Sequence, residues 1–127
     1  MEELKAGQEY TVRTVVEKQQ LAVNVGSGTL EVLATPAVAA LMEKAAWELL
    51  ADYLPEGITT VGTKIQIDHV RATPEGGSVS VTATLTEIDG RRYVFAVIAS
   101  DEKGIIAQGT HERFAVRAER FMEKARS

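Results

Sequence analysis

The spacing of apolar residues along the chain alternates between two periods. Residues 9–16 alternate approximately, with Tyr10 and Val12 set between polar neighbours, which predicts a first strand. Residues 25–29 read Val-Gly-Ser-Gly-Thr. Glycine adds conformational freedom there, and serine and threonine compete for backbone hydrogen bonds, so we expect a flexible loop.

From residue 35 the apolar positions follow a helical period. Thr35 is expected to cap a helix that begins at Pro36, where the missing N–H costs nothing. Residues 55–57, Pro-Glu-Gly, are expected to end it. The stripe predicted to face the core comprises Val38, Met42, Ala45, Leu49 and Tyr53. The polar residues predicted on the opposite side are Lys44, Glu48 and Asp52.

Alternation then returns and predicts a meander of strands. The predicted strands are residues 59–73, 78–87, 91–100 and 105 to about 116. Asp89-Gly90 predicts a tight hairpin, because both residues tolerate the positive φ of such turns. Residues 119–127 are charged, and we expect a short helix there.

One apolar helix with about five antiparallel strands is an α+β pattern in which the sheet must cover the helix. The leading candidate is the hot-dog fold, with one long central helix wrapped by a curved antiparallel sheet of about five strands. A cystatin-like fold or another small α+β roll fits the same periodicity.

Length and composition narrow the class of protein. The chain has 127 residues, which fits a single domain over residues 1–127. A net charge of −4 disfavours a nucleic-acid groove and a polybasic membrane anchor. The chain has no cysteine, so disulfides, thiolate metal sites and a cysteine nucleophile are excluded. Nothing resembles a signal peptide, and the apolar stretch 32–42 is too short to span a bilayer, so we expect a cytoplasmic protein.

Glu43 is the most informative polar position. Its neighbours three and four residues away on the helix are all apolar: Ala39, Ala40, Ala46 and Trp47. Glu43 therefore lacks a cation on its own helix, and desolvation would suit its carboxylate to work as a base or a nucleophile. The alternative is a boundary glutamate that reaches water past Trp47.

Three further positions are candidates. His69 shares a predicted strand face with Ile65 and Ile67, so it is either a hydrogen-bonded core residue or a catalytic group. Thr35 lies at a helix N-terminus, which offers amide donors to a developing oxyanion. Gly62 would let a backbone amide approach a ligand. His111 is expected to be structural. Phosphate-binding loops, nucleophile elbows and dense metal-ligand clusters are absent from the sequence, so we expect no metal.

Taken together, these residues resemble the fluoroacetyl-coenzyme A thioesterase branch of the hot-dog superfamily. The resemblance runs from about residue 5 to residue 124, and no single motif carries it alone. The matching stretches are Ala34-Thr35, Leu41-Met42-Glu43, Gly62-Thr63, His69, Ala72-Thr73-Pro74, Gly90-Arg91-Arg92 and residues 109–113, Gly-Thr-His-Glu-Arg.

The resemblance implies a homodimer whose two sheets join, with acyl-CoA bound near the subunit interface. It implies that Thr35, Glu43 and His69 form the catalytic group. It also implies that Gly62 contributes to the substrate site across the interface and that Arg113 belongs to the substrate site. We expect no cofactor.

Two departures from the family pattern qualify the substrate. The family carries a phenylalanine-bearing lid before the helix, whereas residues 25–32 contain no aromatic residue, and Lys44 replaces a tryptophan. We therefore expect an acyl-CoA thioesterase with little selectivity for a fluorinated acyl group. The alternative is a non-catalytic hot-dog dimer that binds an acyl-CoA or another small metabolite. A hot-dog hydratase is disfavoured, because the expected aspartate–histidine pairing is not apparent.

Overall fold

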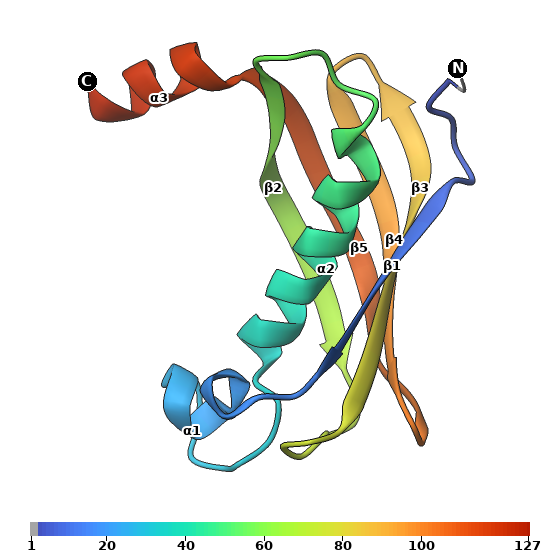
Figure 1. Cartoon of the computed structure of the whole chain (residues 1–127), viewed down its shortest axis with the longest axis vertical. Coiled ribbons are helices and arrows are strands. Elements are labelled where there is room, and N and C mark those ends of the chain that lie inside the picture. Colours follow the sequence, from blue (N-terminus) through green and yellow to red (C-terminus); the bar gives the residue numbers. More distant parts are fainter. Residues whose placement is uncertain (1–2) are drawn as a thin grey trace.

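A curved antiparallel sheet wraps one long helix in the computed structural model, which describes residues 3–127 (Figure 1). The five strands within that range are β1 (Glu9–Val15), β2 (Ile58–His69), β3 (Ser78–Asp89), β4 (Arg92–Asp101) and β5 (Gly104–Arg117). They lie in the order β1-β3-β4-β5-β2, and every neighbouring pair is antiparallel. The helices are η1 (Lys18–Gln20), α1 (Ala22–Val25), α2 (Thr35–Ala51) and α3 (Ala118–Arg126).

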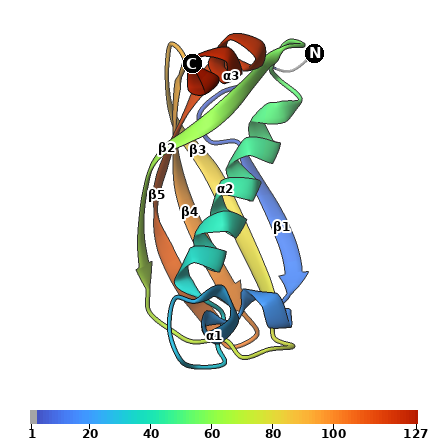
Figure 2. The ribbon, with the colours of Figure 1, turned by 90° about the vertical axis from the view of Figure 1, so that its left-hand side faces the viewer.

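Helix α2 lies diagonally across the concave face of the sheet and supplies one side of the core (Figure 2). Its buried residues are Val38, Met42, Ala45, Ala46, Leu49 and Leu50. The alternating residues of β3 meet them, and all four predicted to share a face are buried: Val79, Val81, Ala83 and Leu85. Tyr53, predicted on the helix stripe, is instead exposed beyond the helix end, where its hydroxyl accepts a hydrogen bond from Gln8. The α+β architecture predicted from periodicity is confirmed.

The start of α2 differs from the prediction. Ala34, not Thr35, occupies the N-cap, and its carbonyl accepts the amide hydrogens of Ala37 and Val38. The Ala34 backbone is extended because its own N–H donates to the Gln20 carbonyl, which anchors it to the preceding segment. The helix therefore starts one residue earlier, and the Thr35 hydroxyl is available for another contact.

The ends of two strands also differ from the prediction. β2 ends at His69 rather than Thr73, because the amides of Val70 and Arg71 both donate to the Ile106 carbonyl and the chain leaves the ladder. The β3–β4 hairpin forms as expected, but its two-residue loop is Gly90-Arg91. Gly90 adopts φ 62°, while Asp89 still pairs with Arg92. The predicted tail helix is α3.

The pairing of β2 with β5 sets the geometry of the sheet edge. A side chain at Gly109 would place its Cβ 1.8 Å from the Gln66 carbonyl oxygen, so only glycine allows the two strands to approach here. A bulge interrupts the register: Gly62 faces Arg113 and Lys64 faces Glu112, which leaves Thr63 as the extra residue. On its other side β2 is a free edge of the sheet (Figure 2). Within residues 3–127, no helix is long and apolar enough to cross a bilayer.

Candidate active site

Two of the predicted site residues meet where α2 begins and β2 ends. The Thr35 hydroxyl lies 2.8 Å from His69 Nδ1. The other ring nitrogen, Nε2, is buried and has no hydrogen-bond partner among residues 3–127. A cavity of about 340 Å³ adjoins this pair and is lined by Thr35, Pro36, His69 and Arg71, among others. A hydroxyl both donates and accepts, so Thr35 can support either tautomer of His69.

Glu43 projects from the middle of α2 towards the edge strand. Its carboxylate lies against Gly62, where a Cβ would come within 2.6 Å of Oε2. Arg113 of β5 donates a hydrogen bond to the same oxygen at 3.4 Å. The Glu43 side chain is 43% exposed and that of Arg113 only 7%. The cation missing from the helix is thus supplied by the sheet, and the carboxylate is held at a position that still reaches solvent.

Arg113 is a buried cation with several acceptors. Its Nε donates to the Thr60 hydroxyl at 2.9 Å and its Nη2 to the Thr60 carbonyl at 3.0 Å. Nη1 also lies 3.2 Å from His111 Nε2. Burial lowers the pKa of Arg113, and the nearby charge of Glu43 acts in the opposite direction. The guanidinium stays charged, and its fork of donors ties β2, β5 and α2 together.

His111 is locked into this network. Its Nδ1 lies 2.8 Å from the Lys64 carbonyl, which only accepts, so Nδ1 carries the hydrogen. Nε2 is therefore the acceptor for Arg113, and the ring is neutral. Burial lowers the pKa of His111, and the ring stacks on Phe95 with centroids 6.0 Å apart. These contacts are those of a structural histidine, as the sequence predicted.

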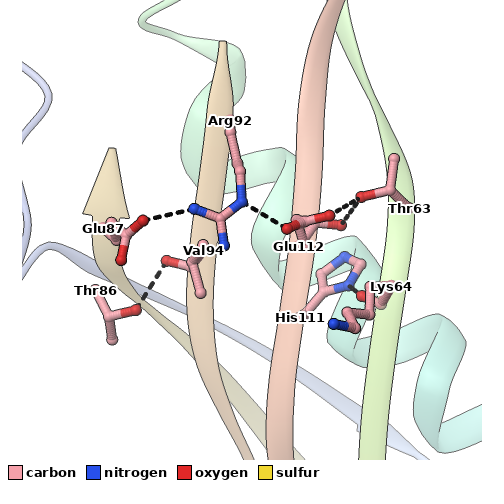
Figure 3. A network of polar contacts seen from close by, with 8 residues as sticks. All are labelled: Thr63, Lys64, Thr86, Glu87, Arg92, Val94, His111 and Glu112. Carbon is pink, nitrogen blue, oxygen red and sulfur yellow. Dashed lines mark hydrogen bonds and ion pairs between the residues drawn. The ribbon is translucent and has the colours of Figure 1, made fainter. Parts of the chain in front are cut away.

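Glu112 follows His111 but points to the opposite face of the sheet (Figure 3). Its carboxylate accepts hydrogen bonds from Arg92 at 2.6 Å and from Thr63 at 2.7 Å. Arg92 also pairs with Glu87 on β3. The hydrogen bond from Thr63, followed by that from Arg92, lowers the pKa of Glu112. Glu112 therefore anchors a row of polar contacts on the outer face and is remote from Glu43.

Within one chain the candidate catalytic residues form two groups rather than one. Thr35 contacts His69, whereas Glu43 contacts Gly62 and Arg113. Glu43 follows Thr35 by eight positions, which correspond to about 12 Å along the helix axis, too far for one hydrogen-bonded group. All five predicted site residues therefore lie on the helix side of the sheet, but in two half-sites.

Thr60 is the residue of this site that the sequence analysis missed. A signal for it exists. Alternation along β5 places His111, Arg113 and Ala115 on one face. A guanidinium on a buried face needs hydrogen-bond acceptors, and because alanine offers none, they must come from the paired strand β2. Thr60 pairs with Ala115 across the ladder and supplies two of them.

The buried neutral state of His111 predicts a pH dependence of stability. Folding lowers the pKa of His111 from its value of about 6.5 in the unfolded chain. Just below pH 6.5 the unfolded chain therefore binds more protons than the folded chain does. His111 therefore contributes stability above that pH, and this contribution is lost as the pH falls. We expect the melting temperature to drop between about pH 7 and pH 5, and to drop less steeply in His111→Gln. Thermal melts across this range measure both slopes, and an equally steep slope in the variant would contradict this assignment.

Comparison with known proteins supports the fold described above and identifies the family of the chain. The sequence model of the fluoroacetyl-CoA-specific thioesterase family matches residues 16–119. The chain is 43% identical over 96 residues to the fluoroacetyl-CoA thioesterase of Streptantibioticus cattleyicolor, covering 76% of this chain and 69% of the relative. A solved structure of a fluoroacetyl-CoA thioesterase is 34% identical and superposes with a TM-score of 0.94 over 98% of this chain and 97% of that one. A hot-dog-like protein from Thermanaerovibrio acidaminovorans is 26% identical, with a TM-score of 0.86 over 94% and 89% of the two chains.

These matches confirm both the hot-dog fold and the family predicted from the sequence. The family model matches residues 16–119 and therefore covers α2, β2 and β5, which carry the two half-sites. This chain belongs to the fluoroacetyl-CoA-specific thioesterase family of hot-dog enzymes, and it is a thioester hydrolase.

Proposed function

We propose that this thioesterase hydrolyses an acyl-CoA to the free acid and CoA, with Glu43 as the base or nucleophile and Thr35 and His69 assisting it. The observation that carries the proposal is the Glu43 carboxylate, which Arg113 holds against the side-chain-free backbone of Gly62. A relative 34% identical to this chain has been solved with acetyl-CoA bound, and another structure contains fluoroacetate and CoA.

The residues supply the groups that thioester hydrolysis requires. As a base, Glu43 takes a proton from water while the water oxygen attacks the carbonyl carbon. The tetrahedral intermediate then collapses, the C–S bond breaks, and His69 protonates the departing CoA thiolate. As a nucleophile, a Glu43 oxygen attacks the carbonyl directly, thiolate leaves, and water hydrolyses the resulting mixed anhydride. In both routes the first turn of α2, which carries Thr35, favours the negative charge that develops.

A homodimer joined through β2 completes the site. One chain keeps His69 and Glu43 in separate half-sites, and β2 has a free edge where pairing with a second copy would cover unpaired backbone groups. Two β2 strands related by a two-fold axis run antiparallel. If the axis passes through Gln66, Ile65 lies opposite the partner's Ile67, and the extra residue of the bulge at Thr63 places Gly62 opposite the partner's His69. The Glu43 carboxylate and the partner's Thr35–His69 pair then flank one pocket.

The bulge at Thr63 makes this register productive. Gly62 and His69 are seven residues apart, so in a regular strand they would face opposite sides of the sheet. The extra residue brings both onto the helix side, where their own chain uses Gly62 to seat Glu43 and His69 to contact Thr35. Each interface would thus contain two equivalent sites.

Replacing Glu43 by glutamine tests the chemistry directly. Glu43→Gln preserves size and removes the charge, so we expect kcat for thiol release to fall by about 10²–10⁴-fold. The melting temperature should fall slightly, since Arg113 loses its counter-ion. Glu48→Gln, on the same helix but paired with Lys44, is the matched control and should keep activity within a few-fold. Near wild-type thiol release by Glu43→Gln would sink the proposal, and CoA binding without any hydrolysis would support the non-catalytic alternative.

Mixing two inactive variants tests whether the site is shared between subunits. A heterodimer of Glu43→Gln and His69→Ala chains has one site with both groups intact, contributed by opposite chains. After unfolding and refolding an equal mixture, about half of the dimers are mixed, so about a quarter of wild-type activity should return. Each variant refolded alone is the control. If both groups act from the same chain, the refolded mixture stays inactive. Light scattering that shows a stable monomer would exclude the dimer.

The segment before α2 determines the expected substrate range. Residues 25–32 begin at the end of α1 and contain Leu30, which is 67% exposed, but no aromatic ring to close over a two-carbon acyl group. We therefore expect kcat/KM for fluoroacetyl-CoA and acetyl-CoA to agree within about tenfold, because one fluorine in place of one hydrogen is a smaller change than the methylene group that an apolar pocket already discriminates only weakly. Thiol release from both substrates measures the ratio. A preference of several orders of magnitude for the fluorinated substrate would mean that another element discriminates.

A further inference from the structure

A second and larger cavity lies at the other end of the helix, away from Thr35 and His69. It measures about 990 Å³ and is bounded by α3, by the segment that follows α2 and by the ends of β2, β4 and β5. Helix α3 projects from the end of β5 beyond the sheet (Figure 1). Its residues form one wall of the cavity. The walls include Leu54, Ile58, Tyr93 and Phe121. We call this cavity the α3 groove.

The α3 groove is rich in positive charge. Arg91, Arg117, Arg120 and Lys124 line it, against a single carboxylate, Glu123. None of these four cations forms an ion pair with any residue in the described range 3–127. The whole chain carries a net charge of −4, so four unpaired cations in one cavity are not a consequence of composition. A cavity of this kind favours an anionic ligand with several acceptor oxygens.

The groove also offers aromatic surface. Tyr93 is buried in its floor, and Phe121 of α3 remains 42% exposed at its wall. Flat rings beside guanidinium groups are the combination that binds a nucleobase together with phosphates, by stacking and by charge-assisted hydrogen bonds. A fatty chain would use the rings but not the cations.

The α3 groove and Arg113 of the candidate active site lie on the same face of β5. Arg113, which holds Glu43, is followed on that face by Ala115 and then by Arg117 at the groove. Arg117 follows Arg113 by four positions, which span about 13 Å of extended strand. The pantetheine arm of CoA is long enough to cover this distance, with the thioester at Glu43 and the nucleotide at Arg117.

We propose that the α3 groove binds the phosphorylated adenosine of CoA, with Arg117 and Arg120 contacting its phosphates and Phe121 contacting the adenine. This inference rests on the proposed acyl-CoA thioesterase function, because it identifies where the same substrate places its nucleotide. It gives α3 a role in substrate binding, although the helix carries no residue of the chemical step.

Calorimetry with CoA, and separately with adenosine 3′,5′-bisphosphate, tests the groove without requiring hydrolysis. We expect Arg117→Ala and Arg120→Ala each to raise both dissociation constants by about tenfold, as loss of a charge-assisted hydrogen bond implies. The wild-type affinity should weaken with added salt, and less so in the variants. Arg13→Ala removes the same charge from β1 at the opposite edge of the sheet, and it should leave both constants unchanged.

Hydrolysis provides the second measurement. The two groove variants should lose at least about tenfold more kcat/KM on acetyl-CoA than on acetyl-N-acetylcysteamine, which lacks the nucleotide. Unchanged dissociation constants for both probes would overturn the groove assignment and leave the thioesterase proposal standing. Absence of thiol release from wild-type enzyme would instead overturn the thioesterase proposal, while calorimetry still decides the groove. If the variants dissociate a dimer without weakening CoA binding, the groove is an interface between copies and the assignment is wrong.

Discussion

The buried guanidinium of Arg113 is the interaction on which the rest of the site depends. Removing a cation from water is costly unless its donors find acceptors, and here the acceptors come from β2, β5 and α2 at once. Thr60 and His111 satisfy part of the fork, and Glu43 supplies the opposite charge. The position of the Glu43 carboxylate follows from this requirement. A residue of the sheet therefore decides where a residue of the helix can act.

The edge strand β2 imposes the second constraint. Gly62 leaves room for the carboxylate, and the bulge at Thr63 turns Gly62 to the side that His69 also faces. Thr63 itself is held on the outer face by Glu112, which Arg92 also binds. The outer row of polar contacts in Figure 3 thus supports the bulge from outside, while Arg113 supports the carboxylate from inside. The Thr35–His69 pair and the Glu43 carboxylate are separate within one chain, which is the physical reason why we propose that the reaction takes place at an interface between two copies.

A good part of the fold was predictable from periodicity alone. The long helix, the alternating face of β3, the hairpin at Gly90 and the tail helix all appear, because each depends on neighbours within a few residues. Glu43 and His69 stood out as polar residues among apolar neighbours, and Thr35 as a polar residue at the expected helix N-terminus. The errors lie at boundaries. The helix cap moved to Ala34 because a backbone contact with Gln20 fixed the preceding residue, and that contact has no local signature.

The sequence by itself determined the architecture and the identity of the candidate residues. Tertiary structure alone decided how they are grouped: Arg113 meets Glu43 across 70 residues, and Thr35 meets His69 across 34. It also decided that four cations share one groove in an acidic chain. The physical reason is the distance along the chain over which each kind of interaction acts. Periodicity reports which side of an element a residue faces, whereas ion pairs and cavities arise where elements distant in the chain pack together.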